Sequence, residues 1–469
     1  MIIQTVLSTW VSSIRSARLW FNQSLLPCEV VLAAVLICFL MVSGCMTIPG
    51  SPVNLGHAGL TILVDDSREL AVVQNLAEEY ENQTGVSVAV KQISAGSGNT
   101  SAALPPGDLL ISGFSHIPGY ASDGQLVPLN IILNTSSSVN WTIFERPSLT
   151  MVGEFPDRSG TIYALPFDQD ALGIAFRADL FDDPNKTAAF CETYGYPLAV
   201  PGSYEELEDV AEFFSQYGSQ HSGIGFAGLQ GSDPISSPWL SLVTSYGSGI
   251  SDRSSGLASG TWNSSRTIAA MTMICNLSSL GPSDAATWGD KEVAEAISSG
   301  SLAIAITWFS QFSGIQAMSE EHNLSVGYMP LPGESMDDGS FRGITIRMTG
   351  IGIRKGGSEE RALAFLTWFY SPDVQLSYGK VGHQPALIPV LDSYSYLSLN
   401  PYNRAFPESM RVGVTAEKGE HAEAVRLICE DAINAIVSDD TMHSEEMMRI
   451  LNASASSIDS IRLKQNYLS

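Results

Sequence analysis

The sequence predicts an α/β protein whose strands pair in parallel and whose length suits two domains. The run 60–64 is short and β-branched, 70–80 places its apolar residues on one helical face, and 86–90 alternates like a second strand. A strand, a helix and a strand in this order form a βαβ unit with parallel strands. Residues 45–469 exceed the size of one typical domain, so we expect two.

The first helix has signals at both of its ends. Asp66 or Ser67 is expected to cap its start, with Glu69 in the first turn. Gly85 is expected to end it, because glycine tolerates the left-handed backbone that often follows a helix.

The same alternation of strands and helices continues along the chain. Ser203 stands three residues before Glu206, which is the spacing of a capping box, and Ser371-Pro372 stops an amphipathic helix. The expected elements are strands at 108–111, 161–167 and 301–307, an edge segment at 124–129, and helices at 207–217, 359–370, 417–437 and 444–461.

The chain begins with the pattern of an export signal. Arg15 and Arg18 precede an apolar run that ends in Ser43-Gly44, directly before Cys45. This pattern resembles the lipobox of prokaryotic lipoproteins, in which cleavage precedes a cysteine that then carries lipid. We therefore expect a signal peptide at 1–44, and a lipid-anchor cysteine with a flexible tether at 45–58. The alternative is an uncleaved anchor, since a spanning helix needs about 20 apolar residues.

The exported part of the chain is strongly acidic. The chain holds 24 basic and 49 acidic side chains, and residues 45–469 keep 22 and 48 of them, a formal net charge of −26. Nucleic acid and anionic lipid head groups need a basic footprint, so this charge argues against both as partners. We interpret the acidity as a solubility feature that identifies no ligand.

Motifs of catalysis and metal binding are missing from the sequence. It has no G-x-S-x-G, H-E-x-x-H, P-loop or calcium-loop pattern. Cys191, Cys275 and Cys429 have no CxxC spacing. One disulfide between two of them is allowed, but the sequence does not choose the pair. We therefore assign no catalytic residue, no metal ligand and no cofactor.

Short motifs, taken in order, resemble those of the extracellular solute-binding proteins of ABC importers, the group that includes maltose-binding protein. The likeness covers nearly all of the chain after the signal. The motifs are Thr84-Gly85-Val86-Ser87-Val88, Pro106-Gly107-Asp108-Leu109, 124–129, Tyr163-Ala164-Leu165-Pro166, 176–181, 203–207, 297–308 and 362–372. In the 297–308 motif, Ala303-Ile304-Ala305 replaces the usual A-A-M, and no glycine precedes Trp308.

The resemblance implies two α/β lobes that are joined by crossing strands, with the ligand in the cleft between them. Pro166-Phe167-Asp168 would mark the first crossing. The N-terminal lobe would comprise 59–166 and 343–381, and the C-terminal lobe 168–340 and 385–469.

Candidate ligand contacts lie where this fold would end its strands at the cleft. Sugar recognition uses flat aromatic faces for the apolar side of a ring, and carboxylates or amides for the hydroxyl groups. The candidates are Asp65, Asp66, Ser97, Phe114, Asp168, Trp239 and Trp308. Structural alternatives are helix capping for the first two, a plain turn for Ser97, a hinge hydrogen bond for Asp168 and core packing for Trp308.

The expected function is that of a membrane-held receptor at the extracellular face, which closes on a small molecule and delivers it to the permease subunits of an ABC transporter. The aromatic candidates favour a carbohydrate as the ligand. Alternatives are the same fold binding a polyamine, a metal ion or an oxyanion, a ligand sensor that imports nothing, and an exported hydrolase. We expect a monomer that is not an enzyme.

Overall fold

The computed structural model describes most of one unit of the chain, residues 57–469. The described residues are 59–94, 103–135, 139–217, 221–231, 235, 237–252, 254–337, 339–415, 418, 421–439 and 442–466. The expected signal peptide, Cys45, the tether and Ser97 therefore lie outside the described residues.

A sheet of nine strands forms the centre of the described part. Its order is β2-β1-β3-β10-β4-β6-β5, with β11 beside β10 and β7 beside β4, while β8 and β9 pair separately. The strands are β1 (Leu60–Val64), β2 (Val88–Gln92), β3 (Leu109–Gly113), β4 (Leu165–Arg177), β5 (Ser222–Phe226), β6 (Leu302–Trp308), β7 (Val326–Pro330), β8 (Glu334–Met336), β9 (Gly339–Phe341), β10 (Ile344–Ile353) and β11 (Gly413–Val414).

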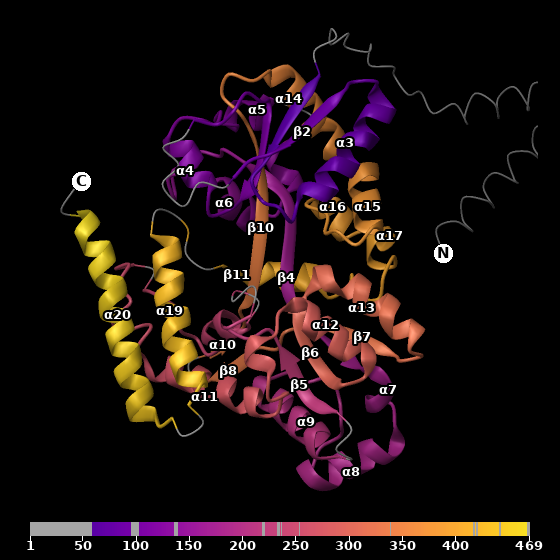
Figure 1. The fold of residues 1–469 in the computed structure, drawn as a ribbon, viewed down its shortest axis with the longest axis vertical. Coiled ribbons are helices and arrows are strands. Elements are labelled where there is room, and N and C mark those ends of the chain that lie inside the picture. The colour runs from indigo at the N-terminus through magenta and orange to yellow at the C-terminus, as the bar shows by residue number, and fades with distance from the viewer. Residues whose placement is uncertain are drawn as a thin grey trace, which may run out of the picture. The chain divides into compact units, whose positions relative to one another are not determined.

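Two long strands, β4 and β10, belong to both halves of this sheet. The first half of β4 pairs with β10, from Leu165 opposite Ile351 to Ala171 opposite Ile346. The second half of β4 pairs with β6 and β7 instead. The far end of β10 pairs with β3, which leads on to β1 and β2. The two strands thus run from one lobe into the other (Figure 1), as the α/β two-lobed prediction requires.

Helices flank the strands in both lobes (Figure 1). They are α3 (Leu70–Thr84), α4 (Ile117–Ser122), α5 (Asn130–Thr135), α6 (Arg146–Gly153), α7 (Ala178–Phe181), α8 (Pro184–Tyr194), α9 (Tyr204–Gln216), α10 (Trp239–Ser245), α11 (Ser265–Ser279), α12 (Asp290–Ser299), α13 (Phe309–Glu321), α14 (Glu359–Phe369), α15 (Pro372–Lys380), α16 (Ile388–Leu391), α17 (Tyr394–Leu397), α18 (Phe406–Arg411), α19 (Ala422–Val437) and α20 (Ser444–Asn466).

Strand β1 is buried on both faces. Ile62 and Val64 pack in the large hydrophobic cluster that extends through the unit, whereas Leu63 packs in a smaller cluster with Leu110 and Tyr120. Successive residues of a strand point to opposite faces, and a parallel sheet covered on both sides buries both sets. The position of β1 explains why its sequence is a continuous apolar run.

The start of the first helix differs from the prediction. Glu69, not Asp66 or Ser67, is the residue before α3, and it makes no capping hydrogen bond. The carboxylate of Asp66 instead accepts hydrogen bonds from Arg68. The end of the helix is confirmed, because Gly85 has a φ of 74° and donates its backbone N–H to the carbonyl of Glu81.

The other predicted elements occur with shifted ends. The cap of α9 is confirmed, since the hydroxyl of Ser203 accepts the backbone N–H of Glu206 at 3.1 Å. The helix predicted at 417–437 begins only at Ala422, and the edge segment at 124–129 is reduced to one bridge, Leu126 with Arg354.

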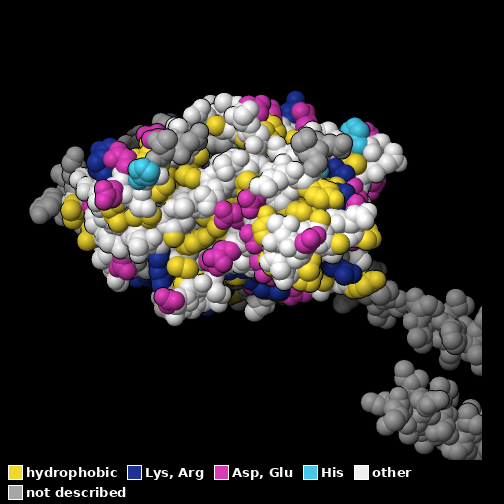
Figure 2. All heavy atoms as spheres, turned by 90° about the horizontal axis from the view of Figure 1, so that it is seen from below, with side chains coloured by type: hydrophobic (Ala, Val, Ile, Leu, Met, Phe, Trp, Pro, Cys, Tyr) yellow, Lys and Arg dark blue, Asp and Glu magenta, His cyan; other side chains and the backbone are white. Residues whose placement is uncertain are grey.

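The surface agrees with the acidic composition. Figure 2 shows one end of the molecule from below, with acidic side chains near the middle of that face and hydrophobic side chains in separate patches. Within the described residues, no helix is both long and apolar enough to cross a membrane.

Candidate functional site

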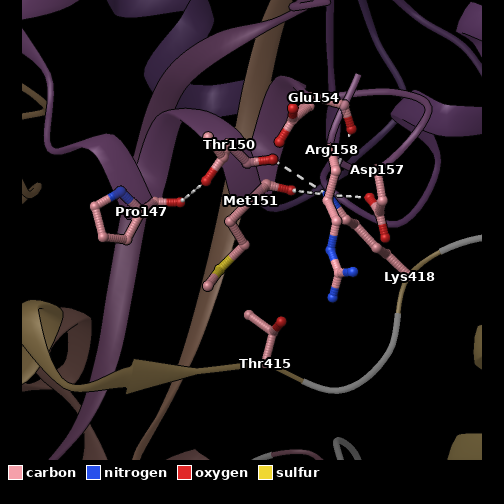
Figure 3. Close-up of a pocket in the computed structure, with 8 residues that line it drawn as sticks. All are labelled: Pro147, Thr150, Met151, Glu154, Asp157, Arg158, Thr415 and Lys418. Carbon is pink, nitrogen blue, oxygen red and sulfur yellow. Dashed lines mark hydrogen bonds and ion pairs between the residues drawn. The ribbon is translucent and has the colours of Figure 1, made fainter. Parts of the chain in front are cut away.

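One pocket lies between α6 and the segment after β11, and it contains none of the predicted site residues. Its volume is about 590 Å³ (Figure 3). Lys418 donates to the carbonyl oxygen of Thr150 at 3.1 Å and forms an ion pair with Asp157 at 3.0 Å. Cations favour the carbonyl end of a helix, so Lys418 stabilises the end of α6. The lining residues are Pro147, Thr150, Met151, Glu154, Asp157, Arg158, Thr415 and Lys418.

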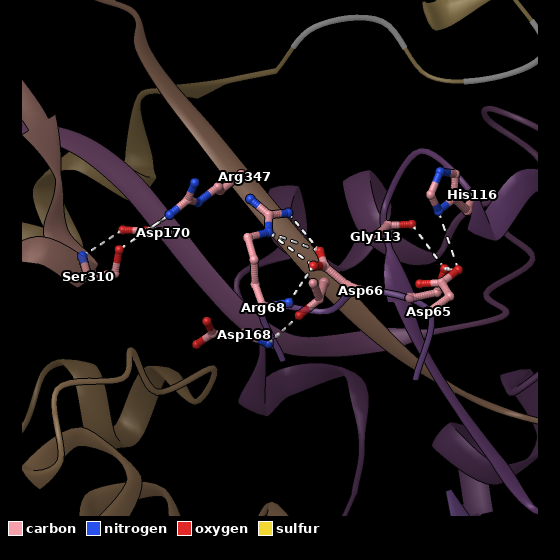
Figure 4. Close-up of polar contacts among 11 residues, drawn as sticks. Asp65, Asp66, Arg68, Gly113, His116, Asp168, Asp170, Ser310 and Arg347 are labelled. Atoms are coloured by element: carbon pink, nitrogen blue, oxygen red, sulfur yellow. Dashed lines mark hydrogen bonds and ion pairs between the residues drawn. The ribbon is translucent and has the colours of Figure 1, made fainter. Parts of the chain in front are cut away.

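A second group of polar residues gathers along the crossing strands (Figure 4). Asp66, just after β1, accepts from Arg68 through both oxygens, at 3.1 Å from Nε and 2.7 Å from Nη2. Burial opposes ionisation, but the hydrogen bonds and charge of Arg68, helped by the charge of Arg347, lower the pKa of Asp66. Asp66 is therefore a fixed, ionised carboxylate at the end of β1.

Asp65, the preceding residue, is directed toward β3 and α4. Its Oδ2 accepts hydrogen bonds from Ser112 at 2.5 Å and from Tyr120 at 3.1 Å, and lies 3.3 Å from His116 Nδ1. The close approach of the Asp65 carboxylate raises the pKa of His116, although burial acts in the opposite direction. These contacts anchor Asp65 within its own lobe, and its contact with a ligand stays a prediction.

Asp168 lies in the first half of β4, in contact with both β10 and α15. Its backbone N–H donates to Thr349 Oγ1 at 3.3 Å, and its Oδ1 accepts from the hydroxyl of Tyr378 at 2.9 Å. Burial raises the pKa of Asp168; the charge of Asp170 adds to this effect, and the charges of His383 and Arg347 oppose it. Asp168 thus makes the hinge hydrogen bonds expected of the structural alternative, and a ligand contact stays a prediction.

Glu69 is a neighbouring carboxyl group. It is buried, and this burial together with the negative charges of Asp168 and Asp66 raises its pKa well above the usual value. Like charges at short range disfavour simultaneous ionisation. Glu69 therefore holds its proton more tightly than an ordinary glutamate.

Asp170, two residues after Asp168, connects β4 with α13 and β10. Its Oδ1 accepts the backbone N–H of Ser310 at 3.1 Å, in the first turn of α13, and its Oδ2 accepts from Arg347 Nη2 at 3.0 Å. The first N–H groups of a helix lack partners within the helix, so this carboxylate satisfies one of them. Asp170 and Arg347 are 6% and 16% exposed.

Both predicted tryptophans are buried. Trp308 is fully buried, and the guanidinium carbon of Arg347 lies 4.1 Å from its ring centroid. Trp239 is 1% exposed and packs edge to face on Trp262, with ring centroids 6.1 Å apart. Phe114 is half-buried and donates its backbone N–H to the carbonyl of Met348 on β10. Ligand contacts of these three residues stay predictions.

We call six of these residues the hinge cluster: Asp66, Arg68, Glu69, Asp168, Asp170 and Arg347. Carboxylates accept hydrogen bonds, and guanidinium groups donate them in a fixed planar fork. A cluster of both kinds suits a ligand that carries several hydroxyl groups. No group of His, Cys, Asp and Glu that could hold a metal ion occurs among the described residues.

Two of these six residues, Asp66 and Asp168, were ligand candidates from the sequence. A usable signal for Asp170 was its spacing, because residues i and i+2 of a strand share a face and Asp168 was already a candidate. Arg347 was detectable as the one charged side chain in the apolar run 344–353. Their contact was not detectable, since 177 positions separate the two residues.

Comparisons with known proteins agree with the two-lobed fold. Three solved structures align over nearly their whole length. Maltose-bound MalE3 of T. maritima has a TM-score of 0.66 and 19% identity and covers 86% of this chain and 99% of its own. A solute-binding protein of Agrobacterium radiobacter in complex with ribitol has a TM-score of 0.67 and 18% identity, and the alignment covers 87% of this chain and 99% of that protein. UgpB of Mycobacterium tuberculosis, in complex with glycerophosphocholine, has a TM-score of 0.63 and 20% identity, and the alignment covers 87% of this chain and 100% of that protein.

At these identities the structural likeness shows the fold. A search of curated protein sequences gave no match. A family profile described as bacterial extracellular solute-binding protein matches residues 65–376, which is well over half of the chain. This match shows that the chain belongs to the bacterial extracellular solute-binding proteins, and its two-lobed fold is that of the solved structures above.

Proposed function

We propose that this protein is a membrane-anchored receptor that binds a carbohydrate outside the cell and delivers it to an ABC transporter permease. The observation that supports this most is the hinge cluster. It combines Asp66, next to β1, with Asp170 and Arg347 on the crossing strands, and Asp170 reaches Ser310 at the start of α13. A ligand held there contacts groups that move relative to one another when the lobes close.

The chemistry of the cluster favours a ligand rich in hydroxyl groups. Asp66 and Asp170 present oxygen acceptors next to guanidinium donors, and one hydroxyl group uses both kinds at once. Two of the three similar structures reported above hold a sugar or a polyol. The alternatives are another solute, of which a polyamine would suit the excess of carboxylates, and a sensor that uses the same closure without import.

We propose an N-terminal lobe of residues 59–166 and 343–381 and a C-terminal lobe of residues 168–340 and 385–469, with one change. The short helices α16 and α17 pack against α15, so we assign 388–397 to the N-terminal lobe. A ligand that contacts both lobes binds the closed form better and therefore shifts the population toward it. We further propose that lipid on Cys45 holds the receptor at the membrane.

A ligand screen by thermal unfolding tests the proposal. The full-length protein, in a detergent without a sugar head group, is heated with sugars, polyols, polyamines, amino acids and metal ions. A ligand at 100 times its Kd adds about 2.7 kcal/mol to the stability of the folded state, which corresponds to a shift of several degrees.

The variants Asp66→Asn and Asp168→Asn should lose the shift given by a sugar. The control is Asp392→Asn, an exposed aspartate that pairs with Arg411 at 2.9 Å, and it should keep the shift. A shift with polyamines or metal ions alone would refute the carbohydrate assignment and leave the receptor role. No shift with any compound would refute both.

A further inference from the structure

Arg347 is held in one position by three contacts. Its Nη2 lies 3.0 Å from Asp170 Oδ2 and 3.3 Å from Ser310 Oγ, and its guanidinium carbon lies 4.1 Å from the ring centroid of Trp308. The side chain starts on the crossing strand β10 and is 16% exposed. A guanidinium that is both paired with a carboxylate and stacked on a ring keeps a fixed orientation.

The position of Arg347 decides whether a sugar ring can stack on Trp308. An indole stacks on a sugar through its flat face, and the guanidinium of Arg347 lies over that face. Trp308 is fully buried in this arrangement. A sugar ring that stacks on Trp308 must therefore displace Arg347 and break its pairing with Asp170.

Trp239, the second tryptophan predicted to stack on a ligand, is also covered. Trp239 is 1% exposed, with its ring against Trp262. Binding of long oligosaccharides uses aromatic faces for successive rings, because each ring has an apolar side that needs cover. Neither tryptophan presents such a face here.

Carboxylates lie within electrostatic range of Arg347. Its charge favours the ionised forms of Asp66 and Asp168 and so acts to lower the pKa of each. Figure 4 shows Arg347 directed toward Asp170 and Ser310, with Asp66 and Arg68 nearby. Carboxylates and guanidinium groups that are held in fixed positions recognise neighbouring hydroxyl groups by paired hydrogen bonds.

We propose that Arg347 determines the ligand class of the hinge cluster. By covering Trp308 and placing N–H donors beside Asp170 and Ser310, it makes the site one for a monosaccharide or polyol held by hydrogen bonds. It excludes an oligosaccharide stacked on Trp308. This inference rests on the proposed function and names the substrate class of the same site.

The test is a titration series on the full-length protein in a detergent without a sugar head group. Isothermal titration compares monosaccharides and polyols with linear oligosaccharides of the same sugars. Wild type should bind one small ligand at least about tenfold more tightly than its oligomers.

Three variants separate the roles of the residues. Arg347→Met keeps the length of the side chain without donors, and Arg347→Lys keeps the charge without the planar fork. Both should lose at least about tenfold in affinity for the small ligand. Trp308→Phe should lose less than either, because its face is not in contact with the ligand. Arg342→Met is the matched control; Arg342 pairs with Glu408 at 2.6 Å, away from the hinge cluster, and its loss should leave the affinity unchanged.

Each result has a distinct meaning. If wild type binds no sugar or polyol, the proposed function fails before any variant is compared. If wild type prefers an oligosaccharide, or if Trp308→Phe loses more affinity than Arg347→Met, the proposed function stands and the role of Arg347 is refuted. The urea midpoint of each variant shows that it is folded, and Arg347→Lys provides the comparison if Arg347→Met does not fold.

Discussion

Asp170 is the residue whose removal should damage this protein most clearly. Its Oδ1 accepts the backbone N–H groups of Ala171 and Ser310, and its Oδ2 accepts from Arg347. The carboxylate is 6% exposed and the guanidinium 16% exposed. Replacement by alanine removes the carboxylate that accepts from the start of α13 and neutralises the mostly buried Arg347.

The size of the effect follows from these contacts. Breaking a buried ion pair by removing one partner costs about 3–5 kcal/mol, since the remaining charge stays buried. An unsatisfied N–H at a helix start costs about 1–3 kcal/mol, and this loss overlaps with the first because the same carboxylate serves both. We therefore expect Asp170→Ala to lower the free energy of unfolding by about 3–5 kcal/mol.

A matched exposed pair supplies the control. Asp392 pairs with Arg411 at 2.9 Å, nearly the same separation, but the side chains are 51% and 54% exposed. Exposed pairs contribute about 0–1 kcal/mol, so Asp392→Ala should change stability little. Asp170→Asn keeps an oxygen for the N–H of Ser310 but loses the charge, and its cost should fall between those of the two alanine variants.

Urea unfolding followed by circular dichroism measures all three variants, and unchanged slopes permit comparison of the midpoints. If Asp170→Ala and Asp392→Ala shift the midpoint equally, the ion pair of Asp170 contributes no more than an exposed one. That result would refute the reasoning from burial.

Three further predictions rest on other parts of the structure. Gly223→Ala places a Cβ 1.8 Å from a backbone carbonyl oxygen of α9, so it should lower the free energy of unfolding by at least about 1–3 kcal/mol. Gly314→Ala, whose Cβ meets nothing within 4 Å in the middle of α13, should raise the free energy of unfolding by about 0.5–1 kcal/mol. Urea midpoints measure both variants. The nearby Asp65 carboxylate, opposed by burial, raises the pKa of His116. The stabilisation from this pair is therefore present below the ordinary value of 6.5 and is lost as the pH rises through the folded value. Wild type should therefore exceed His116→Asn in stability by more at about pH 5.5 than at about pH 8.5. Burial also raises the pKa of the Cys429 thiol, so mass spectrometry after alkylation should show exposed Cys191 modified in the native protein and Cys429 only after unfolding.

The local elements were predictable where a short-range signal exists. The strand at 60–64, the end of α3 at Gly85 and the cap at Ser203 depend on side chains or backbone within four residues, and all three occur as predicted. The start of α3 was wrong because Asp66 has a competing partner, Arg68, which the capping rule does not consider.

The site was predictable only in part, for a different reason. A strand-end position indicated that Asp66 and Asp168 were candidates, and both lie in the hinge cluster. The same reasoning selected Trp239 and Trp308, whose faces are packed against Trp262 and Arg347. Sequence position shows where a side chain starts but not which distant side chain lies against it.

The sequence by itself determined the class of fold, since apolar periodicity and end signals act over a few residues, and the ordered motifs indicated two lobes and a receptor of ABC importers. The tertiary structure decided which charged groups meet. Asp170 and Arg347 are 177 positions apart and come together because they lie opposite each other where the first half of β4 pairs with β10. Their pairing depends on strand register, which long-range packing sets, and that packing places a guanidinium rather than an open indole face in the hinge cluster.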